Sequence, residues 1–417
     1  MARPLVLFSP LPPAKSGIAD YTQELLPALS AIRPVFVVCE RVPDTPPAGG
    51  WQVLSLDDYE RDSRLAMLPH VYQIGNNADH VFAYRAFKRR PGVLVQHDFN
   101  LHYLVEDATL AAGDLQGYRD VLCEEYGEAG GTLADMRQIG LFSEAQKLAL
   151  PLNTHLLHRA TGLIVHSQWV HDRLPADVHE RTLVVPHHFA PQATQFDALR
   201  PAQAREQLGL SPDTFVVLSL GYITPPKQIQ ATLAALAMLR RRGARFVFVI
   251  GGQRNPGFDI DEHVARHGLQ DCVQVTGYLD EQQFFQHIVA ADALVNLRYP
   301  TVGESSGTLT RALALGLPAI VYNFGPFAEM PDDTVLKVPL ELGEPAALAA
   351  TLESLMLNPQ WCSRLGQAAR RHMRASCSVE QSAAMYSQFV DSLSERAIDR
   401  AGAEGRGGPQ SPQLAAA

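Results

Sequence analysis

The stretch TFVVLSLGYITPPKQIQATLAALAMLRRRGARFVFVIGG (214–252) contains the pattern that decides the fold. An apolar run at 214–220 ends at a glycine, a helical pattern occupies 228–241, and a second apolar run follows at 245–252. Strands that are buried on both faces have such continuous runs of Val, Ile and Leu, whereas half-exposed strands alternate with polar residues. The stretch therefore predicts a βαβ unit, in which the two strands are parallel.

The same alternation of strand and helix continues in both directions along the chain. Toward the N-terminus we predict strands at 4–9, 35–40, 70–75, 92–97, 162–167 and 182–187, with a helix at 18–31. Toward the C-terminus we predict strands at 272–279, 293–299 and 318–324, with helices near 260–267, 281–290 and 306–315. The fold class that this order predicts is α/β, with two doubly wound Rossmann-like domains in series.

The boundary between the domains is expected in a polar, proline-containing stretch at 190–213. We assign 1–195 to the N-terminal domain and 205–378 to the C-terminal domain, with mostly helical sequence from about 345 to 393. The end of the chain (398–417) is rich in small and polar residues, Gly and Pro, and this composition predicts a disordered tail.

The charge and cysteine content exclude several classes of protein. Among 417 residues, 35 are Lys or Arg and 44 are Asp or Glu, so the net charge is −9 and nucleic acid is not expected as a partner. The five cysteines lie far apart and form no CxxC pair, which argues against a disulfide framework or a zinc site and fits a reducing cytoplasm.

The apolar segments are all short. The run at the N-terminus is interrupted by prolines and is too short for a signal peptide, and the five-residue stretch 246–250 cannot cross a bilayer. We therefore expect a protein that is soluble or only peripherally bound to a membrane.

Several candidate site residues of the N-terminal half follow predicted strands, where open parallel sheets bind ligands. Ser16 and Gly17 stand at a strand-to-helix turn, where free N–H groups bind anions, although a plain capped helix explains them equally well. His97 and Asp98 follow the strand 92–97, and such a pair can donate to a sugar hydroxyl or move a proton. A structural role for His97 remains the alternative, and we favour structural or lining roles for the histidines at 166, 187 and 188. No metal motif is present.

The C-terminal half has a sharper set of candidates. Gly221 opens the turn after the strand 214–220, and Lys227 precedes the next helix, where a point charge suits a phosphate. Arg298 ends the strand 293–299 and can neutralise a phosphate. The following segment exposes backbone donors at a helix N-terminus and adds one carboxylate that can accept from hydroxyls; its candidates are Glu304, Ser305, Ser306, Gly307 and Thr308.

The order of these motifs resembles the GT-B glycosyltransferases of family 4, the group 1 retaining enzymes, up to about residue 395. The motifs that carry the resemblance are SGIADY (16–21), HD (97–98), HS (166–167), G-x5-K (221–227), GESSG (303–307), RALALGLPAIV (311–321) and FAEMPD (327–332). The resemblance implies a GT-B fold, in which two domains face each other across a cleft and a C-terminal helix (379–397) returns to the first domain. It also implies retaining transfer of a sugar from a UDP- or GDP-sugar to an acceptor hydroxyl, with no metal or other cofactor required.

By the same resemblance, individual residues receive roles. Gly17 would lie near the donor diphosphate and His97 near the donor sugar, while Lys227 would bind the diphosphate. Glu304 and the backbone of 305–308 would face the sugar hydroxyls and a phosphate. We therefore expect His97, Lys227 and Glu304 to be the catalytic residues.

Two positions depart from the family pattern. Tyr222 occupies the place of an arginine that usually follows the glycine of the lysine turn, and Arg311 stands where the second glutamate of an E-x7-E signature belongs. That glutamate usually binds the nucleotide ribose, so ribose recognition must differ here. We include Arg311 in the donor-binding set, and Arg298 would supply the missing positive charge.

The departures leave two other functions open: a degenerate subunit that binds nucleotide-sugars without turnover, and a GT-B epimerase of free nucleotide-sugars. The resemblance implies an acceptor that is a glycan or a lipid-linked glycan, in bacterial polysaccharide or glycolipid assembly. Basic clusters at 88–90, 240–242 and 370–371 would then permit peripheral contact with the inner face of a membrane, and solvated helix ends explain them equally well.

Overall fold

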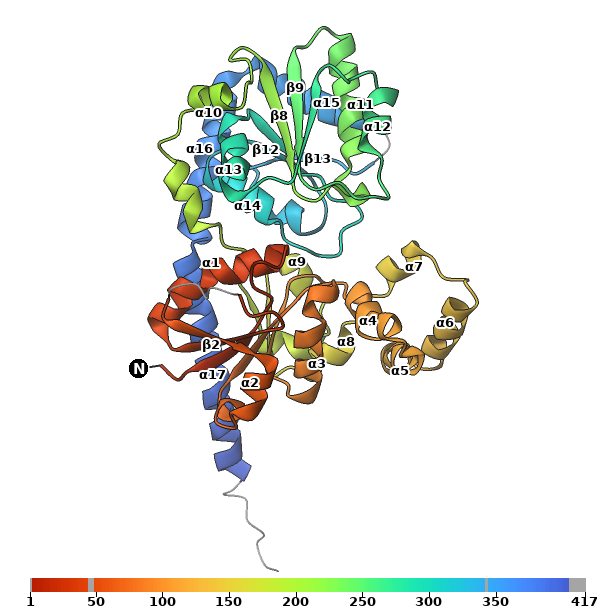
Figure 1. The fold of residues 1–417 in the computed structure, drawn as a ribbon, viewed down its shortest axis with the longest axis vertical. Helices are drawn as coiled ribbons and strands as arrows, with labels where there is room; N and C mark the ends of the chain where they lie inside the picture. The colour runs from red at the N-terminus through yellow and green to blue at the C-terminus, as the bar shows by residue number, and fades with distance from the viewer. Residues whose placement is uncertain (1, 44–48, 342–343, 405–417) are drawn as a thin grey trace, which may run out of the picture.

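The computed structural model describes residues 2–43, 49–341 and 344–404, with side chains described to residue 396. Two separate parallel sheets, one in each half of the chain, form the centres of two domains (Figure 1). The predicted α/β fold class with two doubly wound domains is therefore confirmed.

The N-terminal sheet has seven strands in the order β3-β2-β1-β4-β5-β6-β7. Its strands are β1 (Leu5–Phe8), β2 (Val35–Cys39), β3 (Trp51–Ser55), β4 (His70–Ile74), β5 (Val93–Gln96), β6 (Gly162–Val165) and β7 (Thr182–Val184). The sequence did not reveal β3, because this edge strand is only partly buried and lacks a continuous apolar run.

Helices cover both faces of this sheet. The core on one face contains residues of α1 and α17, and the core on the other face contains residues of α3, α4 and α8. The helices of this half are α1 (Gly17–Ile32), α2 (Leu56–Arg61), α3 (Val81–Arg89), α4 (His102–Ala108), α5 (Leu115–Tyr126), α6 (Glu128–Gln138), α7 (Glu144–Ala149), α8 (Thr154–Leu157) and α9 (Gln168–His171). Helices α4–α8 form an insertion after β5, and α5, α6 and α7 project from the sheet (Figure 1).

The C-terminal sheet has six strands in the order β10-β9-β8-β11-β12-β13. Its strands are β8 (Phe215–Leu220), β9 (Phe246–Gly251), β10 (Val273–Gly277), β11 (Ala293–Val295), β12 (Ala319–Tyr322) and β13 (Leu336–Val338). Its helices are α10 (Pro201–Gln207), α11 (Ile229–Arg241), α12 (Ile260–Arg266), α13 (Glu281–Ala290), α14 (Gly307–Ala314), α15 (Glu344–Leu357) and α16 (Pro359–Ser376). The three-residue edge strand β13 was not predicted.

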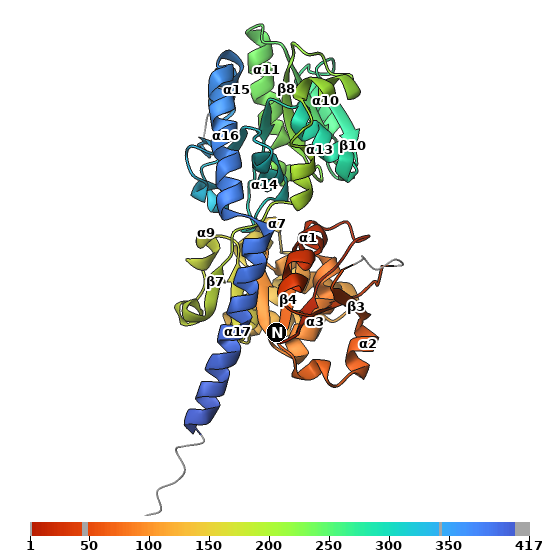
Figure 2. The same ribbon diagram turned by 90° about the vertical axis from the view of Figure 1, so that its left-hand side faces the viewer.

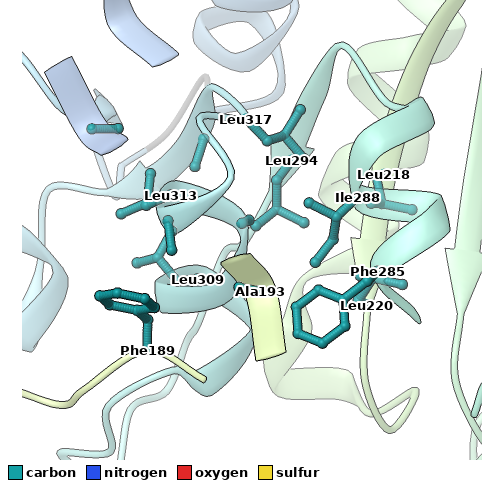
Figure 3. Packing of buried hydrophobic residues seen from close by; sticks show 14 of the residues in the cluster. Phe189, Ala193, Leu218, Leu220, Phe285, Ile288, Leu294, Leu309, Leu313 and Leu317 are labelled. Carbon is teal, nitrogen blue, oxygen red and sulfur yellow. The ribbon is translucent and has the colours of Figure 1, made fainter. Parts of the chain in front are cut away.

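The segment that joins the domains is fixed to the C-terminal core. Phe189 and Ala193 pack in the same cluster as Leu309 and Leu313 of α14 (Figure 3). Each fully buried large apolar side chain contributes roughly 1.5–3 kcal/mol, so this packing holds both the connection and α14 firmly. The N-terminus of α14 consequently has a defined position between the domains.

The last helix, α17 (Val379–Glu404), leaves the C-terminal domain and crosses onto the N-terminal one (Figure 2). Tyr386 and Val390 are buried in the core that α1 and β1 form, and Tyr386 Oη lies 3.0 Å from Tyr21 Oη. Arg33, fully buried, donates to Ser387 Oγ (3.0 Å) and so ties α1 to α17.

The beginning of the expected disordered tail needs correction. The prediction placed it at 398, but α17 continues to Glu404, because the Ala, Glu and Arg residues at its end favour helix more than the single glycine at 402 opposes it. The remainder of the expected tail, 405–417, lies outside the described residues. Within the described chain, no helix combines the length and the apolar character needed to cross a membrane.

Candidate active site

The N-terminal domain contributes a group of aromatic rings at the carboxyl ends of its strands. The ring of Tyr21 on α1 lies 4.9 Å from that of His97, 5.3 Å from His166, 5.0 Å from His187 and 4.1 Å from His188, measured between centroids. The four histidines follow β5, β6 and β7, so the topology brings together residues that the sequence placed after separate strands. We call this group the histidine cluster.

Three imidazoles of the histidine cluster are uncharged at neutral pH. Burial, together with the neighbouring imidazoles, lowers the pKa of His97 and His187 well below the usual range, and burial lowers the pKa of His166 to about 4. The Nε2 atom of His97 lies 2.6 Å from Gln73 Oε1 on β4, which fixes the ring. A neutral His97 can hydrogen bond to a sugar hydroxyl but is a poor general acid at neutral pH.

Asp98 follows His97 and faces the other domain. Its Oδ2 accepts from the Asn76 N–H at 2.7 Å. Burial first, and the charge of Glu304 second, raise the pKa of Asp98 to about 7. The effect of Glu304 indicates that the two carboxyl groups, from different domains, share one region between the domains.

The start of α1 is built as the sequence predicts. Ser16 caps the helix by accepting from the Ile18 N–H at 3.3 Å, and Gly17 is the first helical residue. A Cβ built on Gly17 would meet no atom within 4 Å, so packing within the chain does not require glycine there.

Lys227 is the most buried positive charge of the site. Its side chain is 8% exposed, and Nζ donates to the carbonyl oxygen of Leu220 at the end of β8. Gly221 lies beneath it with a φ of +96°, and a Cβ there would come within 2.5 Å of Nζ. The left-handed backbone therefore favours glycine at 221, and a Cβ there would displace the ammonium group of Lys227 from its present position.

Arg298 adds a second cation beside Lys227. Burial lowers the pKa of both residues, and the charge of Arg298 lowers that of Lys227 further. Arg298 Nε lies 3.8 Å from Glu304 Oε1, whereas no carboxylate of the described residues forms an ion pair with Lys227. Two adjacent cations that are only partly neutralised form a site that favours an anion.

The loop before α14 completes this side of the site. Glu304 Oε2 accepts from Thr301 Oγ1 (2.7 Å) and the Val302 N–H (2.9 Å), so its carboxylate is held in place. Ser306 caps α14 by accepting from the Leu309 N–H at 3.2 Å. Ser305 precedes this cap, and Gly307 and Thr308 form the first turn, whose N–H groups point out of the helix as an anion site.

The predicted donor-binding residues meet at this helix end. Thr308 Oγ1 lies 3.7 Å from the position of a Cβ on Gly221, and hence close to Lys227. Arg311, one turn further along α14, folds back over Gly307 and pairs with Glu24 of α1. The structure thus gathers Gly221, Lys227, Thr308 and Arg311 at one place.

Three further contacts join the two domains. The Asn100 N–H donates to the Val302 carbonyl oxygen at 3.0 Å, and Phe99 packs against Gly303. The carboxylate of Glu329 accepts from the N–H groups of Gln168 (3.0 Å) and Trp169 at the start of α9.

Sequence reasoning missed several of these residues. Tyr21 and Glu24 on α1 and Gln73 on β4 line the site. The sequences of this helix and this strand are typical of ordinary core elements. A signal existed only for Glu24, which is a carboxylate next to the apolar face formed by Tyr21 and Leu25. Nothing local to Gln73 indicates that it contacts His97.

The basic clusters form ion pairs with nearby carboxylates. The pairs are Arg89–Glu60, Arg240–Asp271, Arg242–Glu353 and Arg370–Asp197. Such partly exposed pairs are typical of solvated helix ends. The structure therefore gives no support to membrane contact through these clusters.

Comparison with known proteins agrees with this geometry. The family model described as "Glycosyl transferases group 1" matches residues 202–372. A D-inositol 3-phosphate glycosyltransferase of Streptomyces avermitilis is 27% identical over 378 residues, which cover 79% of this chain and 80% of the relative. An alpha-D-kanosaminyltransferase of Streptomyces kanamyceticus is 24% identical over 51% of this chain and 55% of its own.

Solved structures share the whole two-domain architecture. Sucrose-phosphate synthase from Thermosynechococcus elongatus superposes with a TM-score of 0.68 at 19% identity, over 94% of this chain and 100% of the other. Anabaena HepE, solved with UDP and glucose, gives a TM-score of 0.61 at 16% identity over the same shares. These identities establish the fold, and the family model and relatives establish the kind of enzyme. The chain is therefore a glycosyltransferase with the GT-B fold, and its C-terminal domain resembles the group 1 enzymes.

Proposed function

We propose that this glycosyltransferase moves a sugar, with retention of anomeric configuration, from a UDP- or GDP-sugar to a hydroxyl of a glycan or lipid-linked acceptor in bacterial polysaccharide or glycolipid assembly. The observation that carries the donor class is the buried pair of cations, Lys227 and Arg298, next to the N-terminus of α14. A diphosphate bound there would relieve the repulsion between the cations and would accept from the N–H groups of the helix.

The proposed chemistry needs no metal and no protein base. As the bond between sugar and diphosphate breaks, negative charge develops on the leaving phosphate, where Lys227, Arg298 and the N–H groups of α14 would stabilise it. The acceptor hydroxyl would attack on the same face, and the departing phosphate would take its proton. The stabilising charge would come from these two cations.

The acceptor would bind to the N-terminal domain, opposite the donor. His97, neutral and held by Gln73, would hydrogen bond to a hydroxyl of the transferred sugar, and Glu304 would accept from another. Anabaena HepE has been solved with UDP-glucose, which supports a UDP-sugar as the first donor to test. The D-inositol 3-phosphate glycosyltransferases suggest a polyol-like acceptor, either free or at the end of a glycan. Five free thiols fit a cytoplasmic enzyme.

A donor panel tests the proposal directly. The purified full-length chain is mixed with UDP- and GDP-sugars, with and without inositol phosphate, simple glycans and lipid-linked sugars, and release of nucleotide is measured. Release that depends on one donor and one acceptor, with retention seen by NMR of the product, is the expected result. Binding without turnover on any acceptor would instead indicate a degenerate subunit. Interconversion of free nucleotide-sugars, seen by chromatography, would indicate an epimerase.

A further inference from the structure

One ion pair joins the two domains directly beneath the proposed donor site. Arg311 of α14 donates through Nη2 to Glu24 Oε1 of α1, although the two residues lie 287 positions apart in the chain. The side chain of Glu24 is 7% exposed and that of Arg311 14%, so the pair is almost completely buried. A buried pair of this kind strongly disfavours any movement that separates its partners, because each charge would be left without compensation.

A second side chain lies near the carboxylate of Glu24. His188 Nε2, from the segment between the domains, lies 3.6 Å from Glu24 Oε2. Burial alone would raise the pKa of Glu24, but its contacts with His188 and Arg311 outweigh burial and lower the pKa below the usual value. Glu24 is therefore ionised at neutral pH and forms a true ion pair with Arg311.

The arginine is fixed against the end of α14 as well. Its Nη1 lies 2.6 Å from the position that a Cβ on Gly307 would occupy, and His187 Cε1 lies 3.7 Å from the same point. The absence of a side chain at Gly307 leaves the space that the guanidinium occupies. The pair thus reaches from α1 to the first residue of α14, where the donor phosphate is proposed to bind.

We propose that Glu24 is a positioning residue of the transferase: through Arg311 it holds the N-terminus of α14, and the donor bound there, against the acceptor side of the N-terminal domain. The proposal rests on the proposed function of the site. It also explains why an arginine stands at position 311, where the family pattern has a glutamate: the arginine holds the two domains together.

The test separates binding of the donor from its use. Glu24→Gln keeps the shape of the side chain and removes its charge, and Arg311→Gln removes the partner. We expect each variant to lose kcat by about 10- to 100-fold, as a displacement of about 1 Å does. For Glu24→Gln, whose side chain is outside the donor-binding set, the donor Kd, measured by calorimetry, should change by less than about threefold. The double variant should be no worse than either single one, because both act through one contact.

Two controls distinguish positioning from general loss of stability. Asp292→Asn breaks the Arg205–Asp292 pair, which has a distance of 2.6 Å and lies wholly within the C-terminal domain; it should lower the Tm without lowering kcat. Exchanging the charges, with Glu24→Arg and Arg311→Glu in one chain, restores a pair and should recover part of the lost kcat.

Opposite results would overturn the proposal. If Glu24→Gln weakened the donor Kd in parallel with kcat, the ion pair would serve donor binding rather than positioning. Multiplicative effects in the double variant would mean that the two residues act separately. Small-angle scattering gives a readout that needs no donor: Glu24→Gln should have a larger radius of gyration than the parent chain, and an unchanged radius would refute the proposal. If the parent chain acts on no donor, the proposed function fails, and scattering still decides whether Glu24 holds the domains together.

Discussion

Replacing Lys227 with methionine removes an ammonium charge and keeps an unbranched side chain of similar length. Lys227 Nζ is buried against the carbonyl of Leu220, and its neighbour Arg298 is also a cation. At a partly buried site with an effective dielectric constant of about 20, two unit charges about 4 Å apart interact by about 4 kcal/mol. Because about 1.4 kcal/mol corresponds to a factor of ten, loss of this interaction with the leaving phosphate should lower kcat by about 10³-fold.

In the absence of donor, Lys227→Met should be more stable than the parent chain. Burial lowers the pKa of Lys227 in the folded chain. Below that lowered pKa the ammonium is charged in both the folded and the unfolded chain, so the full free-energy cost of burying the charge opposes folding. This cost decreases as the pH rises toward the pKa of an exposed lysine. Methionine carries no such penalty, so the Tm at pH 7 should rise. The rise in Tm that UDP causes in the parent chain should be largely lost.

Lys337→Met is the matched control. Lys337 Nζ pairs with Asp332 at 2.6 Å in the same domain but away from the predicted donor site. Its replacement should leave nucleotide release within a few-fold of the parent rate and should not raise the Tm. Near-normal turnover of Lys227→Met, with the parent active, would refute the role assigned to this charge.

Three further predictions follow from contacts between the domains. Burial raises the pKa of Asp98 to about 7, so between its ordinary value near 4 and pH 7 the folded chain keeps a proton that the unfolded chain has lost, and stability falls as the pH rises through this window. In urea titrations the free energy of unfolding of Asp98→Asn, relative to the parent, should be about 4 kcal/mol higher at pH 8 than at pH 4, because one pKa unit corresponds to about 1.4 kcal/mol. An equal effect at both pH values would contradict this. Gly303→Ala should lower kcat by about 10²-fold, because φ is +82° and the new Cβ would lie 2.4 Å from Phe99 Cβ of the other domain. Gly243→Ala is the control: φ is +87° there, but a Cβ would meet no atom within 4 Å. This variant has only the backbone strain and should keep its kcat. Glu329→Gln replaces a carboxylate that accepts from two N–H groups of α9 by a weaker acceptor, and should lower the free energy of unfolding by about 1 kcal/mol in urea titrations. An unchanged free energy of unfolding would show that this contact between the domains does not stabilise the protein.

The sequence predicts the parts of the fold that depend on local pattern. Continuous apolar runs such as 214–220 predict buried parallel strands, and the residues just after them, such as His97 and Lys227, do lie at the carboxyl ends of the sheets. The edge strand β3 (51–55) escaped prediction because it is only partly buried and has no continuous apolar run. The insertion α4–α8 consists of short helices whose arrangement depends on contacts with one another rather than on a regular repeat.

The partners of the site residues were beyond prediction for a different reason. Glu24 meets Arg311, and Gln73 meets His97, only after the two sheets have formed and come together. No periodicity or spacing in the chain records such contacts, because each partner is locally compatible with an ordinary helix or strand. The sequence could therefore indicate candidate site residues, but not the side chains that contact them and fix their positions.

The crossing of α17 has a consequence for synthesis of the chain. Tyr386 and Val390 fill the core that β1 and α1 begin, so the first domain to leave the ribosome lacks part of its interior until the last segment emerges. About 200 residues separate the end of that domain from Val390, and at roughly 5–20 residues per second their translation takes on the order of 10–40 s. During this time the nascent domain exposes apolar surface, so chaperones that bind emerging chains have a defined period and a defined face on which to act.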